Sequence, residues 1–136
     1  MRIDGQCHCG AIRWEADIDP ANVGICHCTD CQTLSGTAFR TVAAATRGNF
    51  RMLAGTPRVY VKLAESGNPR AQAFCGDCGS PIYAANPGDD PPGYSIRLGT
   101  ARQRAGLVPR YQLWSRSACA WLSGLGAVPR HEKTKG

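Results

Sequence analysis

The sequence predicts a mainly β fold, in which short antiparallel strands are held together by a four-cysteine zinc site and little of the chain is helical. Three observations carry this prediction. Apolar and polar residues alternate over several short segments, glycine and proline separate these segments, and eight cysteines stand in closely spaced groups. Alternation with a period of two is typical of half-buried strands, and cysteines this close together are typical of zinc-binding turns.

Alternation identifies the predicted strands. In the first of them, Ile12, Trp14 and Ala16 share one face, and Arg13 and Glu15 share the other. Side chains of a strand point alternately to opposite faces, so one face of this segment is expected in the core. In chain order, the predicted strands are residues 11–16, 49–53, 58–62, 71–75, 81–85, 94–98 and 110–114.

The remaining elements are expected to be short. The residues after Cys28 are expected to form one or two helical turns, with Thr29 as the N-cap and Gly36 as the stop. A further turn is expected at 100–105. The segment 86–93 is rich in proline, glycine and aspartate and is predicted to be an irregular loop.

The length of 136 residues fits one domain. We expect a single zinc-binding domain over residues 1–125 and a basic C-terminal tail over residues 126–136. A structural zinc adds on the order of 10 kcal/mol to the folding of a small domain, so the metal is expected to matter for the fold.

Composition argues against several classes of protein. No window reaches the roughly 18 apolar residues of a membrane span, and the first residues lack the apolar region of a signal peptide, so a cytoplasmic location is expected. The net charge of +6 comes from 13 arginines and 3 lysines against 10 acidic residues. The arginines are scattered, as on a solvated surface, and no basic stripe is interleaved with aromatics. Binding of nucleic acid is therefore the minority interpretation.

The first and last cysteine groups have the spacing of two halves of one metal site. They are Cys7-His8-Cys9 and Cys75-Gly76-Asp77-Cys78. A glycine follows each pair, and glycine allows the positive φ at which backbone amides turn toward thiolates. If the fold brings the halves together, their four thiolates form a structural zinc site. A redox pair at 75–78 is the alternative, although no βαβ pattern precedes it.

The middle group supplies three cysteines, Cys26, Cys28 and Cys31. Three protein ligands leave one coordination position free, which is the pattern of a catalytic zinc, whereas four ligands are the pattern of a structural one. Two alternatives stay open. A fourth ligand could come from elsewhere, such as Cys119, a histidine or an aspartate, or the site could hold no metal.

The other candidate ligands are expected to stay away from the metal. Cys119 lies among apolar residues and is expected to be a free, buried cysteine. His8 and His27 each stand between two cysteines, so in an extended segment they would point away from an ion held by their neighbours.

Three stretches of sequence resemble the glutathione-dependent formaldehyde-activating enzyme family, a group of small, mainly β zinc proteins. They are Gly5-Gln-Cys-His-Cys-Gly10, Cys26-His-Cys-Thr-Asp-Cys31-Gln-Thr-Leu-Ser-Gly36 and Phe74-Cys-Gly-Asp-Cys-Gly79. Weaker similarity extends the resemblance over residues 5 to 121. One departure is Ala120 before Trp121, where the family often has proline.

The resemblance implies a structural zinc at Cys7, Cys9, Cys75 and Cys78 and a catalytic zinc at Cys26, Cys28 and Cys31. It also implies a carbon–sulfur lyase similar to S-(hydroxymethyl)glutathione synthase, which joins a small thiol such as glutathione to an aldehyde such as formaldehyde. A zinc ion lowers the pKa of a bound thiol, and the thiolate is the nucleophile.

Two arginines are candidates for offsetting the negative charge of a three-thiolate zinc site or for binding a carboxylate of glutathione. They are Arg40 and Arg116, because a guanidinium matches the geometry of a carboxylate. The alternative function is a non-catalytic zinc-binding module for contact with protein or nucleic acid. The expected partners are thus a thiol and an aldehyde, with no membrane, and the oligomeric state is left open.

Overall fold

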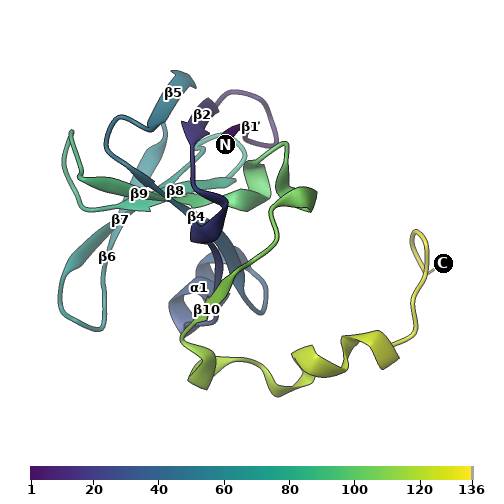
Figure 1. Ribbon diagram of the computed structural model, residues 1–136. Helices are drawn as coiled ribbons and strands as arrows, with labels where there is room; N and C mark the ends of the chain where they lie inside the picture. Colours follow the sequence, from purple (N-terminus) through teal and green to yellow (C-terminus); the bar gives the residue numbers. More distant parts are fainter. Residues whose placement is uncertain (136) are drawn as a thin grey trace.

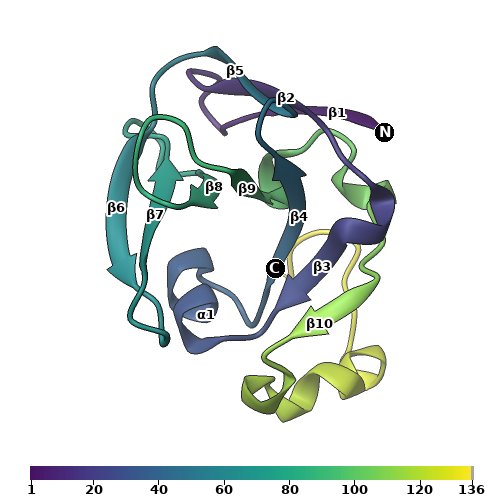
Figure 2. The same ribbon diagram turned by 60° about the vertical axis from the view of Figure 1, so that its left-hand side comes forward.

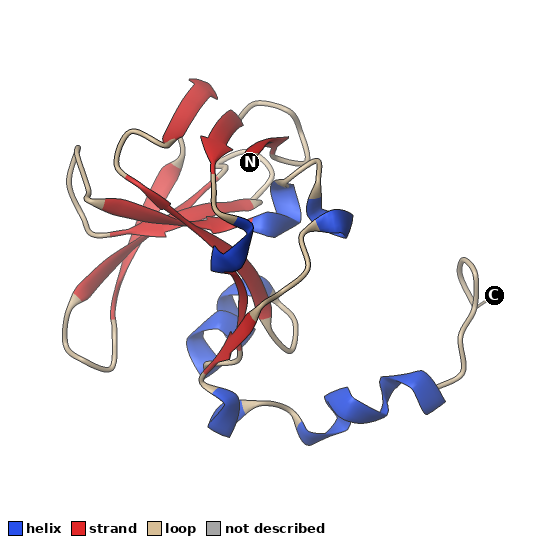
Figure 3. Ribbon diagram, in the orientation of Figure 1, coloured by secondary structure: helices blue, strands red, loops and turns tan. Residues whose placement is uncertain are grey.

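The computed structural model describes residues 1–135 and contains two β-sheets with one short α-helix. Figure 3 shows that strands make up most of the body, which confirms the predicted mainly β class. Gly136, the last residue of the predicted tail 126–136, lies outside the described residues. No helix within residues 1–135 is long and apolar enough to span a membrane.

The smaller sheet has three antiparallel strands in the order β1-β2-β5. Their bounds are β1 (Arg2–Gln6), β2 (Arg13–Asp17) and β5 (Phe50–Ala54). The first cysteine group belongs to this sheet, because Cys7 and Cys9 lie in the turn between β1 and β2.

The larger sheet has seven strands in the order β10-β3-β4-β9-β8-β7-β6. All neighbours are antiparallel except β10 and β3, which are parallel. The strand bounds are β3 (Val23–Cys26), β4 (Arg40–Thr46), β6 (Arg58–Leu63), β7 (Pro69–Phe74), β8 (Pro81–Ala85), β9 (Gly93–Arg97) and β10 (Tyr111–Leu113). Figure 1 shows the two sheets meeting near β4 and β5.

The core is centred on aromatic side chains of both sheets. The rings of Trp14 and Phe50 stack with centroids 5.8 Å apart, and Phe50 also contacts Tyr83 and Tyr94. Trp14 is fully buried, and its indole Nε1 donates a hydrogen bond to Thr100 Oγ1 at 3.0 Å. The indole N–H of the largest core side chain therefore has a hydrogen-bond partner.

Replacement of Trp14 by alanine is expected to destabilise the protein by about 3–5 kcal/mol, because it leaves a large cavity and removes the hydrogen bond to Thr100 Oγ1. Trp121 offers a matched control, since 59% of its surface is exposed. Trp121→Ala should change the free energy of unfolding by less than about 0.5 kcal/mol. Chemical denaturation of both variants checks this, and equal losses would contradict the assignment of the core.

The seven predicted strands are present, with ends shifted by one or two residues, and residues 86–92 form the expected irregular connection. Three further strands, β1, β3 and β4, were not predicted. In β4, Val42 and Ala43 are both buried although they are adjacent, so no alternation marks this strand.

The single α-helix, α1 (Thr29–Ser35), begins one residue earlier than predicted, because Cys28 and not Thr29 is its N-cap. Cys28 Sγ accepts a hydrogen bond from the Cys31 amide at 3.2 Å. Gly36 ends the helix in the left-handed conformation, as predicted. The helix is tied to strand β6 by Lys62 Nζ, which lies 2.7 Å from Asp30 Oδ2.

Several 3₁₀ helices complete the fold, among them Leu98–Thr100 and Arg104–Gly106, near the predicted turn at 100–105. Another, Ala120–Ala127, follows the short turn Ser115–Ser117. Figure 1 shows this C-terminal segment in yellow-green, extending away from the two sheets.

Candidate metal centre

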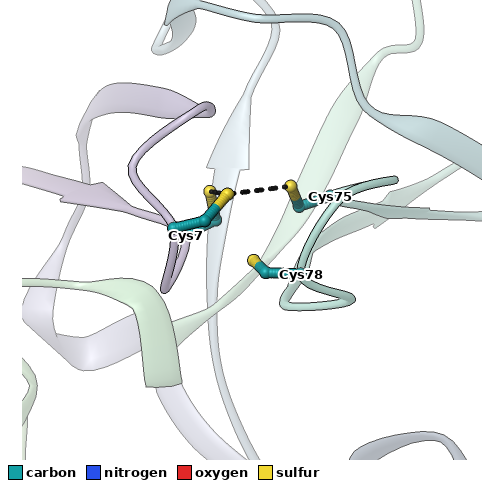
Figure 4. Close-up of side chains that lie close together, drawn as sticks. Cys7, Cys75 and Cys78 are labelled. Atoms are coloured by element: carbon teal, nitrogen blue, oxygen red, sulfur yellow. Dashed lines mark hydrogen bonds between the residues drawn. The ribbon is translucent and has the colours of Figure 1, made fainter.

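Cys7, Cys9, Cys75 and Cys78, here called the outer cluster, come together as the spacing predicts. All four sulfur atoms lie within 4.8 Å of one another. Cys9 Sγ lies 3.6 Å from Cys7 Sγ and 3.7 Å from Cys75 Sγ. In a tetrahedral site with bonds of about 2.3 Å, sulfurs are roughly 3.8 Å apart. Figure 4 shows the side chains of the two turns pointing toward one another.

Two glycine-containing turns position these sulfurs. Gly10 and Gly79 have φ of 83° and 80°, as the sequence predicts for turns around a metal. The Ile12 amide donates to Cys7 Sγ at 3.2 Å. Ser80 joins the two turns, since its hydroxyl accepts from the His8 amide at 3.0 Å and lies 3.3 Å from Cys78 Sγ.

The electrostatics of the outer cluster are those of thiols that share protons. The Ser80 hydroxyl and nearby amides lower the pKa of Cys78 to about 5. The Ala11 amide lowers the pKa of Cys9, but the Cys7 thiol and burial outweigh this effect, and the pKa of Cys9 rises to about 12. Such a group loses its first proton easily and its last one reluctantly, unless a cation takes the place of the protons.

Cys26, Cys28 and Cys31, here called the middle cluster, lie where strand β3 passes into helix α1. Their sulfurs also lie within 4.8 Å of one another. A hydrogen bond from the Cys31 thiol lowers the pKa of Cys26 to about 5. The same bond, together with burial, raises the pKa of Cys31 well above its ordinary value. The three thiols thus form a second place where a soft cation could replace protons.

Among residues 1–135, no fourth cysteine, histidine, aspartate or glutamate joins the middle cluster. His27 is buried, but its Nε2 lies 2.7 Å from Gln112 Oε1. Cys119 is only half-buried, which corrects the prediction of a buried cysteine. It follows Trp114 and Arg116 in the exposed C-terminal segment, where few side chains can cover it.

Comparison with known proteins places this arrangement of cysteines in a family. A family model described as "Glutathione-dependent formaldehyde-activating enzyme" matches residues 2–117. The chain belongs to this family. The match covers both cysteine clusters and confirms the resemblance seen in the sequence.

Two known proteins are similar to this member of the formaldehyde-activating enzyme family. A Halomonas elongata protein, provisionally named as a glutathione-dependent formaldehyde-activating enzyme, is 24% identical over 91 residues. The matched part is 64% of this chain and 58% of that protein, so the chain spans less than two thirds of this relative's length. A crystal structure of a Rhodobacter sphaeroides protein has a TM-score of 0.60 at 20% identity, covering 82% of this chain and 99% of that one, and shows a shared fold.

In this family member, a cavity of about 440 Å³ opens beside the middle cluster. Cys28 lines it, together with residues of α1, of the loop after β6 and of the segment after β10. Arg116 also lines it; its guanidinium lies 4.9 Å from the centre of the Trp114 ring and 3.4 Å from Glu65 Oε1. A ligand in this cavity could therefore contact Cys28 of the middle cluster and the Arg116 cation.

Arg40 lies in a different place from Arg116, deep in the sheet. It pairs with Cys26 across strands β3 and β4, and only 6% of its surface is exposed. Burial lowers the pKa of Arg40, and the charges of the three thiols oppose this effect. Arg40 and Arg116 line separate cavities, so the structure does not bring the two predicted arginines together.

A second buried arginine, Arg97 at the end of β9, was not predicted. Burial, followed by the positive charge of Arg40, lowers its pKa, while the charges of Cys31 and Cys26 oppose the change. In the sequence, Arg97 alternates with Ile96 and Leu98, which is the pattern of a solvent-facing side chain. No signal in the sequence distinguishes it from an exposed arginine.

Proposed function

We propose that this chain is a zinc-dependent carbon–sulfur lyase that adds a small thiol, such as glutathione, to an aldehyde at the middle cluster. The observation that carries the proposal is the contrast between the clusters. Four sulfurs converge in the outer cluster, whereas three converge in the middle cluster, beside a cavity that Cys28 lines. A closed set of four ligands suits a structural ion, and three ligands leave room for a substrate.

The residues present fit zinc on the chemistry of the donor set. Sulfur ligands at these separations suit a tetrahedral soft cation, with Cys7, Cys9, Cys75 and Cys78 holding one ion and Cys26, Cys28 and Cys31 a second. When bound at the middle cluster, zinc would supply a lowered pKa for an incoming thiol.

The chemistry of addition needs few groups beyond a thiolate. The thiolate sulfur attacks the aldehyde carbon, a carbon–sulfur bond forms, and the carbonyl π electrons move to oxygen, which takes up a proton. The chain's own side chains then orient the two reactants and exclude competing water. Arg116 is the candidate for holding a carboxylate of the thiol at the mouth of the Cys28 cavity.

The test is the rate of adduct exchange in solution. Thiol and formaldehyde combine without a catalyst, so exchange between free and bound ¹³C-formaldehyde is measured by NMR in the presence of glutathione, with and without the zinc-loaded protein. Catalysis predicts faster exchange in proportion to protein concentration. An exchange rate equal to the uncatalysed one, with glutathione and with smaller thiols, would favour the alternative of a non-catalytic zinc-binding module.

Arg116→Gln is expected to raise the KM for glutathione about 3- to 10-fold and to leave kcat unchanged, because an exposed charged contact is worth little more. The side chain of Arg116 is 72% exposed, so the fold should not change. Arg110→Gln removes an exposed arginine outside this cavity and serves as the control. Equal KM values for the two variants would remove Arg116 from the thiol site.

A further inference from the structure

Two buried arginines lie side by side next to the middle cluster. In the antiparallel pairing of β4 and β9, Val42 stands opposite Arg97, and Arg40 is two residues from Val42 on the same face. Arg40 and Arg97 are only 6% and 9% exposed. They line the same two cavities, of about 200 and 300 Å³.

The hydrogen-bonding capacity of this pair is not filled by the protein. Arg97 donates from Nη2 to Gln72 Oε1 at 2.8 Å and from Nη1 to Ser95 Oγ at 3.1 Å. Within residues 1–135, the buried Nε and Nη2 of Arg40 and the Nε of Arg97 have no acceptor. A guanidinium has five N–H donors and no means of becoming an acceptor, so each unfilled donor is a cost to the folded state.

The charge of the pair is also not balanced by a carboxylate. None of the ion pairs among residues 1–135 includes Arg40 or Arg97. The opposite charges that act on both are the thiolates of the middle cluster. With zinc bound, three thiolates leave that cluster at only −1, so two guanidiniums beside it retain an excess positive charge. Buried like charges without a partner destabilise the folded protein. Such charges are typical of functional sites, where a bound ligand of opposite charge removes the cost.

We propose that Arg40 and Arg97 bind a small carboxylate next to the middle cluster. Paired guanidiniums match a planar carboxylate through parallel N–H donors. The size of the ligand follows from the smaller cavity, whose 200 Å³ equals the liquid volume of roughly seven water molecules. A two- to four-carbon acid fits that space, and a whole tripeptide does not.

The walls of the smaller cavity agree with such a ligand. Leu34 of α1, Phe74 of β7 and Tyr83 of β8 line this cavity together with the two arginines, so a short carbon chain could meet apolar surface there. If the proposed function holds, the carboxylate belongs to a reactant. It is then either the carbonyl compound itself, as an oxo acid, or one end of the thiol.

Binding is tested without turnover, so that it can fail or succeed independently of the lyase activity. The zinc-loaded full chain is titrated with acetate and with glyoxylate at constant ionic strength, by calorimetry and by the shift in Tm. The proposal expects saturable binding, weakened at least 10-fold in Arg40→Gln and in Arg97→Gln, and unchanged in Arg110→Gln. Absence of saturable binding to the wild type, or equal binding by all variants, would overturn it.

A second measurement does not depend on the variants. Saturation transfer in NMR from the aromatic protons of the wild-type protein to the methyl group of acetate is expected, because Phe74 and Tyr83 line the cavity. Transfer that is absent would overturn the proposal even if both arginine variants failed to fold.

The source of the carboxylate is decided by competition. If acetate displaces glutathione from the protein, the site holds the carboxylate of the thiol. If acetate and glutathione bind together and glyoxylate displaces acetate, the site holds an oxo acid. Either result supports a carboxylate site, whereas binding of glutathione without any binding of acetate or glyoxylate would contradict it and leave the proposed function standing.

Discussion

Cys75→Ser is expected to prevent folding of the protein at 37 °C. Cys75 is 1% exposed and belongs to the outer cluster, which joins the turn after β1 to the turn after β7. A structural zinc contributes on the order of 10 kcal/mol, which is comparable to the whole stability of a domain. Serine is a poor zinc ligand, so most of that contribution should be lost. Far-UV circular dichroism and the yield of soluble protein measure the effect.

Cys119→Ser is the matched control for this prediction. Cys119 is half-buried and belongs to neither cluster, so the same chemical change should leave the fold and the zinc content intact. A folded Cys75→Ser protein with unchanged Tm would contradict a structural role for the outer cluster.

Cys28→Ser is expected to abolish catalysis while leaving the fold intact. Cys28 lines the cavity beside the middle cluster and caps helix α1 through its sulfur. Serine is a good N-cap, so the helix should keep its start. Loss of one of three metal ligands should lower the protein-catalysed exchange rate of the glutathione–formaldehyde adduct by more than about 100-fold. Mutation of residues that only hydrogen-bond to metal ligands already costs about 10- to 100-fold in metal affinity or activity. The exchange rate and Tm are measured on the same sample.

The result contrary to this prediction is a normal exchange rate in the folded Cys28→Ser protein. That result would place any activity outside the middle cluster. A large fall in Tm together with the loss of activity would instead give the middle cluster a structural role. This is the alternative from the sequence in which a fourth ligand completes the site.

The sequence was sufficient for much of this account because the cysteines carry their own geometry. Cys75, Cys78 and Gly79 fix a turn locally, and the same holds for Cys7 and Cys9, so the outer cluster forms once the sheets bring the two turns together. Strands with a regular alternation, such as β2, were also predictable. The assignment of zinc, catalysis and the domain limits stays a prediction.

The remaining features depend on the surroundings of a residue and not on its neighbours in sequence. β4 has adjacent buried residues, so it lacks the alternation that marks a half-exposed strand. Arg97 looks like a solvent-facing residue, yet it lines a cavity with Leu34 of α1. Only the fold reveals that Arg97 and Arg40 share a face beside the middle cluster. In Figure 2, α1 lies between β7 and the strands β3 and β4, close to this face.

The most direct test of the central claim, a closed structural site and a separate open one, is zinc per chain by elemental analysis. The protein is purified under reducing conditions as the wild type and as Cys28→Ser, and its fold is checked by circular dichroism. We expect two zinc ions per wild-type chain and one in the folded Cys28→Ser variant. One zinc in both proteins would mean that the middle cluster holds no ion, and the proposed mechanism would lose its basis.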